Sequence, residues 1–516
     1  MNGAETLVKT LLGSGVTVCF ANPGTSEMHF VAALDQHPDL RCILCLFEGG
    51  ASGAADGYFR MTGQVAATLL HLAPGFGNAF ANLHNAAKAH SGVLNIMGDH
   101  ATYHLRYETP LRGDTVGIAR AISQWTRVTP DAVSVASDGA AAIQAARSKN
   151  GQIATLILPA DTAWGDATGP AISAAPPVLR RPGMDAVQAA ATALALPDGM
   201  LLIDGAALWG DLQITATRIA KATGCTLICP YLAPRLRRGE GSFLGQRMAY
   251  RVADNLPLLA QTRTLVLCGA DRPAGFFAYP GLPGVPEPAG CHVMELCSPD
   301  MDGAWTLTAL AQVLGATDLP VGSADLQHLN LPPVPTGVVT LDKLGQAIAA
   351  LMPAETIVVD EMVSSAGPIV ARTLAARAHD WLNISGGAIG FGLPCAVGAA
   401  VACPDRKVLA LQADGSGMYT LQSLWSMARE GLDVTVVIFA NRGYQILRLE
   451  MAAMGAAAGR NAQAMFDIDG PVLDWVALAK GHGVDGVRVT DMEQFAAAFG
   501  GAMGRKGPYL IEVICP

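Results

Sequence analysis

The chain has 516 residues and a formal net charge of −9, with 15% charged and 51% hydrophobic residues. This composition excludes an intrinsically disordered chain, and its acidic balance excludes the basic surface of a nucleic-acid-binding protein. No apolar run reaches the ~18 residues of a membrane span, and the first residues lack the basic flank and apolar core of a signal peptide. We therefore expect a cytoplasmic protein that binds neither membrane nor nucleic acid. The scarcity of charge also predicts surfaces buried against other subunits.

Apolar runs of strand length alternate with helical patterns along the chain, as they do in parallel sheets covered by helices. Pro-rich stretches at about 168–184 and 317–337 interrupt this alternation and predict linkers. We therefore expect an α/β fold with three doubly wound parallel-sheet domains, at residues 1–167, 185–316 and 338–516. The predicted strands are, in chain order, 16–20, 42–47, 65–70, 93–97, 153–158, 201–204, 226–229, 264–269, 356–360, 407–412, 434–440, 484–489 and 509–514.

Polar residues follow three predicted strands of the first domain, at the sheet edge where ligands bind. Gly24 and Thr25 come after the first strand, Glu48 after the second and His71 after the third. A glutamate that begins a helix can simply favour the helix dipole, and a histidine can be a satisfied core residue. However, Glu48 follows an apolar strand and precedes two glycines, so poor solvation suits it to proton transfer. For His71, the turn-rich segment that follows leaves both interpretations open, a satisfied core residue and an acid–base group.

Two strand ends of the third domain predict a metal-bound diphosphate. Asp414 and Asn441 each follow a strand, and one crossover separates the two strands. If these strands are neighbours, their ends lie about 5 Å apart, and the two side chains can share a Mg²⁺ ion with phosphate oxygens. Gly415 permits close backbone approach, and the helix start at Ser416 offers N–H groups to an anion. Either residue alone is an ordinary turn residue, but the pair at this spacing favours the Mg²⁺ site.

A glycine-rich segment, residues 386–394 with the sequence Gly-Gly-Ala-Ile-Gly-Phe-Gly-Leu-Pro, precedes a predicted helix of the third domain. By itself, such a segment can be a tight junction between a helix and a strand. Beside the site predicted at Asp414, it instead indicates a wall of bare backbone against which a flat ring can lie.

With these motifs, the chain resembles the thiamine-diphosphate-dependent 2-oxoacid decarboxylase and acetohydroxyacid synthase family over essentially its whole length. The resemblance implies a pyrimidine-binding domain, a middle domain and a diphosphate-binding domain, in that order. The metal motif of the family is Gly-Asp-Gly followed later by Asn-Asn; here it stands as Ala-Asp-Gly and Ala-Asn, with Asp414 and Asn441 at the ligand side chains. Gly443 falls where the family supplies a backbone carbonyl. Ala413 and Ala440 depart from the motif, but neither position supplies a ligand.

The resemblance also implies roles around thiamine diphosphate. Glu48 matches the glutamate that bonds the pyrimidine N1′ atom, and Gly387 and Ile389 match positions whose backbone holds the pyrimidine ring. Ile389 would also bend the cofactor. His71 matches a histidine that benzoylformate decarboxylase has and acetohydroxyacid synthases generally lack. Further predicted cofactor contacts are Gly24, Thr25, Asp414, Gly415, Ser416 and Asn441.

Two positions leave the substrate open. Phe276 stands near the place of a second active-site histidine of benzoylformate decarboxylase. Glu450 stands near the place of the tryptophan that shapes acceptor choice in acetohydroxyacid synthases. From the resemblance we expect an enzyme that decarboxylates a 2-oxo acid and transfers the carbanion to a second carbonyl, as an acetolactate synthase does. The alternative is a simple decarboxylase of the benzoylformate decarboxylase type.

Two other hypotheses receive less support from the sequence. A paralogue that binds the cofactor without turnover is disfavoured because Glu48 and Asp414 are both present. A nucleotide-binding oxidoreductase is disfavoured because the middle domain has no Gly-x-Gly-x-x-Gly after a strand. Glu48 and Asp414 lie in different domains, and the active sites of this family combine residues from two subunits. The resemblance therefore implies a homodimer at least, and the low charge content favours a homotetramer.

Overall fold

The first domain is a six-stranded parallel sheet with strand order β2-β1-β3-β4-β6-β5. Its central strands are buried on both faces, which explains why they appear in the sequence as continuous apolar runs. The computed structural model describes residues 1–515, so Pro516, the last residue of the predicted third domain, lies outside it. The strands are β1 (Val18–Asn22), β2 (Arg41–Leu44), β3 (Ala66–Leu70), β4 (Val93–Asp99), β5 (Trp125–Val128) and β6 (Ile153–Pro159). The helices are α1 (Gly3–Gly13), η1 (Thr25–Glu27), α2 (Met28–Leu34), α3 (Glu48–Thr62), α4 (Leu72–Lys88), η2 (Thr102–His104), α5 (Thr115–Arg120), α6 (Val135–Arg147) and α7 (Ala160–Trp164).

The second domain has a five-stranded parallel sheet with strand order β10-β8-β7-β11-β12. The strands of this sheet are β7 (Gly199–Ile203), β8 (Thr226–Cys229), β10 (Gln246–Arg247), β11 (Thr264–Cys268) and β12 (His292–Cys297). A further strand of this domain, β9 (Arg235–Arg238), joins the sheet of the third domain. The helices are α8 (Met184–Leu194), η3 (Gly205–Leu208), α9 (Leu212–Thr223), α10 (Val252–Leu259), α11 (Gly303–Val313) and, in the following linker, η4 (Ser323–Asp325).

The third domain has a seven-stranded sheet with strand order β17-β18-β16-β15-β13-β14-β9. Six strands are parallel, and β9, contributed by the second domain, pairs antiparallel with β14. The six strands of this domain are β13 (Ile357–Glu361), β14 (His379–Asn383), β15 (Val408–Ala413), β16 (Val434–Ala440), β17 (Asp485–Val489) and β18 (Tyr509–Ile514). The helices are α12 (Leu341–Leu351), η5 (Val363–Ser365), α13 (Ala366–Arg372), α14 (Gly392–Ala402), α15 (Asp414–Gly417), α16 (Ser423–Arg429), α17 (Gln445–Ala453), α18 (Arg460–Ala464), α19 (Trp475–Gly481) and α20 (Met492–Gly504).

These three sheets confirm the predicted α/β class. Five strands are not predicted from the sequence because they are short, polar or interrupted by charge: β5, β9, β10, β12 and β14. The predicted second strand is also too long, because β2 ends at Leu44 and residues 45–47 form a loop before Glu48. The predicted helix after Asp414 is two short helices, α15 and α16, separated by residues 418–422.

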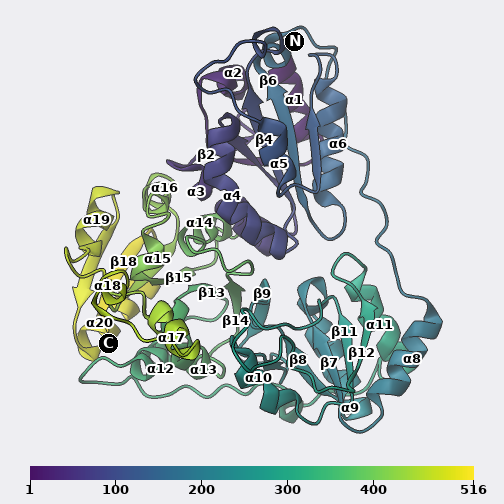
Figure 1. The fold of residues 1–516 in the computed structure, drawn as a ribbon, viewed down its shortest axis with the longest axis vertical. Helices are drawn as coiled ribbons and strands as arrows, with labels where there is room; N and C mark the ends of the chain where they lie inside the picture. Colours follow the sequence, from purple (N-terminus) through teal and green to yellow (C-terminus); the bar gives the residue numbers. More distant parts are fainter. Residues whose placement is uncertain (516) are drawn as a thin grey trace.

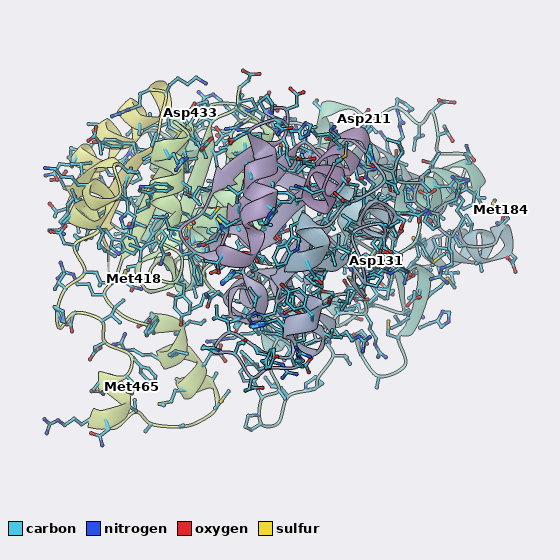
Figure 2. The ribbon with its side chains drawn as sticks, turned by 90° about the horizontal axis from the view of Figure 1, so that it is seen from above. Asp131, Met184, Asp211, Met418, Asp433 and Met465 are labelled. Carbon is cyan, nitrogen blue, oxygen red and sulfur yellow. The ribbon has the colours of Figure 1, made fainter. Side chains whose placement is uncertain are left out.

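The three domains form three lobes, with the first at the top of Figure 1, the second at lower right and the third at lower left. Figure 2 shows the segment that carries Met465 projecting from the body of the third domain. Within residues 1–515, no helix combines the length and the apolar character needed to span a bilayer.

Helix α3 of the first domain crosses α14 of the third domain at close range, and glycines make this crossing possible. A Cβ atom on Gly57 would lie 2.2 Å from the carbonyl oxygen of Cys395, and one on Gly398 would lie 1.8 Å from that of Ala54. Real Cβ atoms do not approach backbone oxygens this closely, so the crossing requires glycine at both positions. A single hydrophobic cluster runs through both helices and the sheets beneath them.

One buried arginine on α3 contacts all three domains. Arg60 forms an ion pair with Asp56 on the same helix, with 2.6 Å between Nη2 and Oδ2. Its Nη1 donates to the carbonyl oxygens of Pro234 at 3.2 Å and Asn383 at 2.5 Å, which belong to the second and third domains. The guanidinium also lies 4.7 Å from the ring centroid of Phe391. The buried charge is therefore both paired and hydrogen-bonded, as it must be in a core.

We predict that Gly398→Ala destabilises the chain by about 1–3 kcal/mol or more, because the new methyl group collides with backbone of α3. The measurement is chemical denaturation followed by circular dichroism. Gly367→Ala in α13 is the matched control, since a Cβ there meets no atom within 4 Å. Equal effects of the two substitutions would contradict the importance of the crossing.

Candidate active site

Glu48 is the first residue of α3, and its side chain is buried between α3 and α4. Asn78 of α4 donates from Nδ2 to its Oε2 at 2.9 Å. A Cβ atom on Gly75 would lie 3.0 Å from its Oε1, so the glycine leaves room beside that oxygen. The carboxylate thus sits at the positive end of a helix dipole, with one oxygen held by Asn78.

His71 is held by a buried carboxylate that the sequence analysis missed. Its Nδ1 lies 2.9 Å from Oε2 of Glu27 and 3.2 Å from Oγ of Ser26. Glu27 itself is 4% exposed, and its Oε2 also accepts the N–H of Gly24 at 2.7 Å. A proton on Nδ1 directed at Glu27 leaves Nε2 free to face a ligand. The missed signal is the spacing of Gly24 and Glu27, a helix-capping pattern at the start of η1.

Glu48 and His71 lie close together, because both contact the position of Gly75. A Cβ on Gly75 would lie 3.0 Å from the Glu48 carboxylate and 3.4 Å from Cβ of His71. A Cβ on Gly24 would lie 2.1 Å from Nδ1 of His71, so Gly24 makes room for the imidazole. Thr25, the first residue of η1, is exposed beside this group. The structure thus brings together the predicted residues of the first domain.

The ends of β15 and β16 bring Asp414 and Asn441 together, because the two strands are parallel neighbours. Asp414 is buried, and its Oδ1 and Oδ2 accept the backbone N–H groups of Gly415 at 2.8 Å and Arg442 at 2.7 Å. Oδ1 of Asn441 accepts the N–H of Gly443 at 3.1 Å. The turn that links these residues depends on Arg442, whose φ of 58° is in the left-handed region.

A divalent cation fits this arrangement. Burial raises the pKa of Asp414, and the N–H groups of Arg442 and Gly415 lower it only in part. The carboxylate therefore lacks the positive charge that would stabilise its ionised form, and a bound cation would supply it. Carboxylate, amide and carbonyl oxygens at Asp414, Asn441 and Gly443 are the donor types that Mg²⁺ prefers. The hydroxyl oxygen of Ser416 accepts a hydrogen bond from Nε2 of Gln412 at 2.6 Å, and the hydroxyl donates to the carbonyl oxygen of Ala413 at 3.3 Å, so only the backbone N–H of Ser416 in α15 is left for an anion.

The glycine-rich segment is held in place by two asparagines on α4. Asn85 donates from Nδ2 to the carbonyl oxygen of Ala388 at 2.8 Å and accepts the N–H of Ala388 at 3.1 Å. Asn82 donates to the carbonyl oxygen of Gly390 at 3.0 Å. Gly387 and Gly390 have φ values of 72° and 94°, which favour glycine.

Glu361, at the end of β13, holds the same segment from the other side. It accepts the N–H groups of Gly390 and Gly392 and is 1% exposed. Burial raises its pKa to about 7, and the two N–H donors oppose that shift. The sequence analysis missed Glu361, Asn82 and Asn85, because neither residue type nor spacing distinguishes them from ordinary core polar residues.

A cleft of about 600 Å³ lies between the second and third domains, with Gly387 and Ile389 in its wall. Phe276 covers the glycine-rich segment, since a Cβ on Gly387 would lie 2.5 Å from its ring. Among residues 1–515, all residues lining the cleft fall between Tyr231 and Glu450, so Glu48 and His71 lie outside it. Asp414, Asn441 and Gly443 do not line the cleft either, so of the predicted site residues it borders Gly387 and Ile389.

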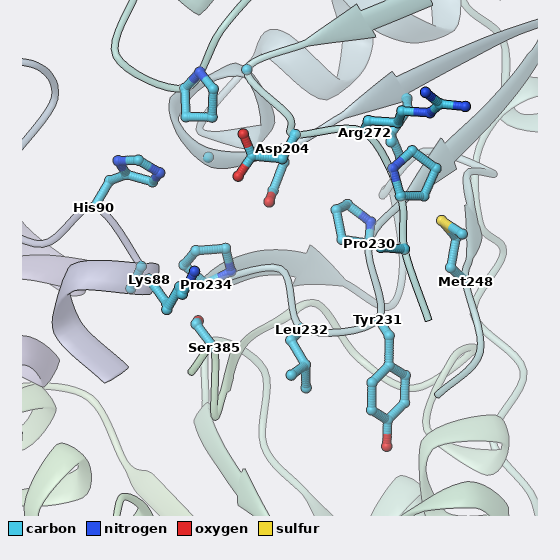
Figure 3. A pocket seen from close by; sticks show the side chains of 18 of the residues that line it. Lys88, His90, Asp204, Pro230, Tyr231, Leu232, Pro234, Met248, Arg272 and Ser385 are labelled. Carbon is cyan, nitrogen blue, oxygen red and sulfur yellow. The ribbon is translucent and has the colours of Figure 1, made fainter. Parts of the chain in front are cut away.

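A second hollow, of about 260 Å³, lies beyond the strand ends of the second domain where all three domains meet. Figure 3 shows Asp204 of the second domain on the same side of the hollow as Lys88 and His90 of the first domain and Ser385 of the third, whereas the side chain of Arg272 points away from them. Burial raises the pKa of Asp204 to about 7.

Two segments of the chain match models of known protein domains. Residues 1–122 match the N-terminal TPP binding domain of thiamine pyrophosphate enzymes, and residues 366–513 match the C-terminal TPP binding domain. The chain belongs to the thiamine pyrophosphate enzymes. The two matched segments carry Glu48 and His71 on one side and Gly387, Asp414 and Asn441 on the other.

Individual members of this family resemble the chain over its whole length. A Mycobacterium tuberculosis protein, provisionally named acetolactate synthase large subunit IlvX, is 48% identical over 100% of this chain and 99% of its own. Benzoylformate decarboxylase of Pseudomonas aeruginosa is 28% identical over 97% of this chain and 96% of its own. The structure of the thiamine diphosphate-dependent 4-hydroxybenzoylformate decarboxylase of Rhodococcus jostii RHA1 superposes with a TM-score of 0.86 at 25% identity, covering 100% of this chain and 99% of that one. These likenesses confirm the resemblance and the fold predicted from the sequence.

Proposed function

We propose that this chain binds thiamine diphosphate through Mg²⁺ and decarboxylates a 2-oxo acid. The family membership supports the cofactor, and the oxygen donors of Asp414, Asn441 and Gly443 support the metal. When bound, the cofactor would supply an electron sink for the bonding electron pair that stays behind when CO₂ leaves. The protein supplies binding and orientation, and it places acid and base groups around the reacting carbon.

Glu48 and His71 have different roles in this proposal. Glu48 holds a proton at the pyrimidine side of the cofactor, through the oxygen that faces Gly75 while Asn78 fixes the other one. His71, oriented by Glu27, moves a proton at its Nε2, where it faces the substrate. Acid–base groups of this kind contribute about 10²–10⁴-fold to rate.

The fate of the carbanion has two candidates. The His71–Glu27 pair supports protonation to an aldehyde, because a histidine oriented by a buried carboxylate can deliver a proton. The geometry therefore favours a simple decarboxylase, which the sequence analysis held as its alternative. Transfer to a second carbonyl is the other candidate, and it rests on the relative of 48% identity that is named an acetolactate synthase.

Product analysis tests the function and separates these candidates. We expect the protein, supplied with thiamine diphosphate, Mg²⁺ and a panel of 2-oxo acids, to release CO₂ and the corresponding aldehyde. Chromatography separates aldehydes from 2-hydroxy ketones, and 2-hydroxy ketones as the main product would instead favour the carboligase. No CO₂ from any 2-oxo acid would contradict the proposed function.

A second prediction separates Glu48 from His71. Glu48→Gln should slow exchange of the cofactor C2 proton for deuterium, because this residue acts on the cofactor before substrate arrives. His71→Ala should leave that exchange nearly intact and reduce turnover by about 10²–10⁴-fold. NMR of the bound cofactor measures exchange, beside steady-state kinetics. Equal loss of exchange in both variants would contradict the division of roles.

We also propose that the working unit is at least a homodimer, in which Glu48 of one copy faces the cleft of the other. The separation of Glu48 from the cleft within one chain supports this proposal. The low charge content is compatible with further assembly to a tetramer. In a symmetric dimer of this kind, two equivalent sites form at the interface between the copies.

Mixed dimers test the shared site. Glu48→Gln and Asp414→Ala should each be nearly inactive, the latter because it should lose thiamine diphosphate binding, which calorimetry measures. Co-expression should restore about a quarter of all sites, since about half of the dimers are mixed and half of their sites are intact; purification on two different affinity tags isolates the mixed dimers, in which about half of the sites are intact. The control pairs Glu48→Gln with the double variant, which offers no intact site. Failure of the first pair to exceed this control would place each site within one chain.

A further inference from the structure

Helix α17 buries a charged side chain and exposes apolar ones, the reverse of the usual arrangement in a helix that packs on a core. Glu450 is the buried residue of this helix, at 8% exposed, although it is the helix's acid. Leu447 and Leu449, on the same helix, are 43% and 39% exposed. Burying a carboxylate while exposing two leucines is unfavourable for folding alone. Glu450 also lines the 600 Å³ cleft, so its position points to a ligand.

One oxygen of this carboxylate has a partner and the other is free. Oε2 of Glu450 accepts the hydroxyl proton of Tyr279 at 2.7 Å. Oε1 is buried and has no hydrogen-bond partner among residues 1–515. Burial raises the pKa of Tyr279, as does its hydrogen bond to Glu450, and burial together with the charge of Glu450 raises the pKa of Tyr250. Both phenols therefore stay neutral, and the one proton of Tyr279 is already committed to Oε2.

The cleft between this oxygen and the glycine-rich segment has an aromatic wall. Phe276, which covers Gly387, lies 5.0 Å from the ring of Tyr250 and 4.9 Å from that of Phe277, between centroids. A flat apolar body fits against such a wall. The carboxylate of a 2-oxo acid and that of Glu450 repel each other, so the acid group belongs away from Glu450 and the opposite end of the substrate belongs at Glu450.

We propose that Glu450 determines specificity by selecting aromatic 2-oxo acids whose far end carries a hydroxyl that donates a hydrogen bond to Oε1. This inference rests on the proposed function, because it names the substrate class of that site. An analogue without the hydroxyl leaves Oε1 buried and unpaired. Sites built to bond a substrate hydroxyl reject such analogues by about 10⁴–10⁵-fold when the partner groups are fully buried.

Two substrate pairs that differ by one hydroxyl test the proposal: 4-hydroxybenzoylformate with benzoylformate, and 4-hydroxyphenylpyruvate with phenylpyruvate. We expect kcat/KM to favour the hydroxylated member of at least one pair by about 10²-fold or more. Glu450→Leu should reduce that ratio to near one, and Glu450→Gln should give an intermediate ratio. A wild-type ratio near one in both pairs, or the same ratio in Glu450→Leu, would overturn the proposal.

Two control variants separate hydrogen bonding from general effects. Tyr279→Phe removes the existing partner of Glu450 but keeps the carboxylate, so the preference for the hydroxyl should persist. Asp254→Asn neutralises an exposed carboxylate of the same cleft and should leave the ratio unchanged. Loss of the preference in Asp254→Asn would show that net charge, and not Glu450, sets it.

A binding measurement keeps the test independent of turnover. Mandelate and 4-hydroxymandelate lack the ketone, so calorimetry on the protein with thiamine diphosphate and Mg²⁺ measures their binding alone. Tighter binding of 4-hydroxymandelate to wild type, lost in Glu450→Leu, would support the inference even if no 2-oxo acid is decarboxylated. In that case the proposed function fails and the assignment of Glu450 stands. Equal binding of the two compounds to wild type would overturn it.

Discussion

The close crossing of α3 and α14 is the constraint on which the rest of the structure depends. Gly57 and Gly398 let the two backbones meet without side chains between them, so the first and third domains share one core. At this distance, a shift of either helix costs packing along its whole length. Arg60 stabilises the same junction, because it donates hydrogen bonds to backbone carbonyl oxygens of the other two domains while Asp56 balances its charge.

The crossing also sets the geometry of the cofactor-binding backbone. With α3 fixed, α4 is fixed as well, and its asparagines at positions 82 and 85 hold the glycine-rich segment by side-chain hydrogen bonds. Glu361 holds that segment from the sheet. A loop that contains left-handed glycines is otherwise free to move, so these contacts order it before any ligand arrives. Order of this kind avoids a reorganisation cost during binding.

Much of the fold and of the candidate site could be predicted from the sequence, for reasons that differ between elements. Buried parallel strands such as β11 and β16 consist almost wholly of apolar residues, and such runs are visible without a structure. Asp414 and Asn441 could be paired because each follows such a strand. By contrast, β9 contains three arginines in four residues, and only the partners that it meets, Asp380 and Trp381, make it a strand. Glu361 could not be identified either, since its role comes from residues distant in the chain, whereas the capping pattern of Gly24 and Glu27 marked Glu27 as a local partner without showing its contact with His71.

Strand β9 has a consequence for how the chain can be divided. It leaves the second domain to cover the edge of β14, where a row of unpaired backbone groups would otherwise face solvent. A fragment that begins at the linker near residue 338 would lack this cover and would present β14 as a template for pairing with other chains. The second domain, cut at the same linker, would carry Arg238 without the aromatic ring beneath it. The Pro-rich linkers therefore mark where the chain passes between lobes. Cutting the chain at a linker does not give fragments that fold independently, because β9 belongs to the second domain in sequence and to the sheet of the third domain in structure.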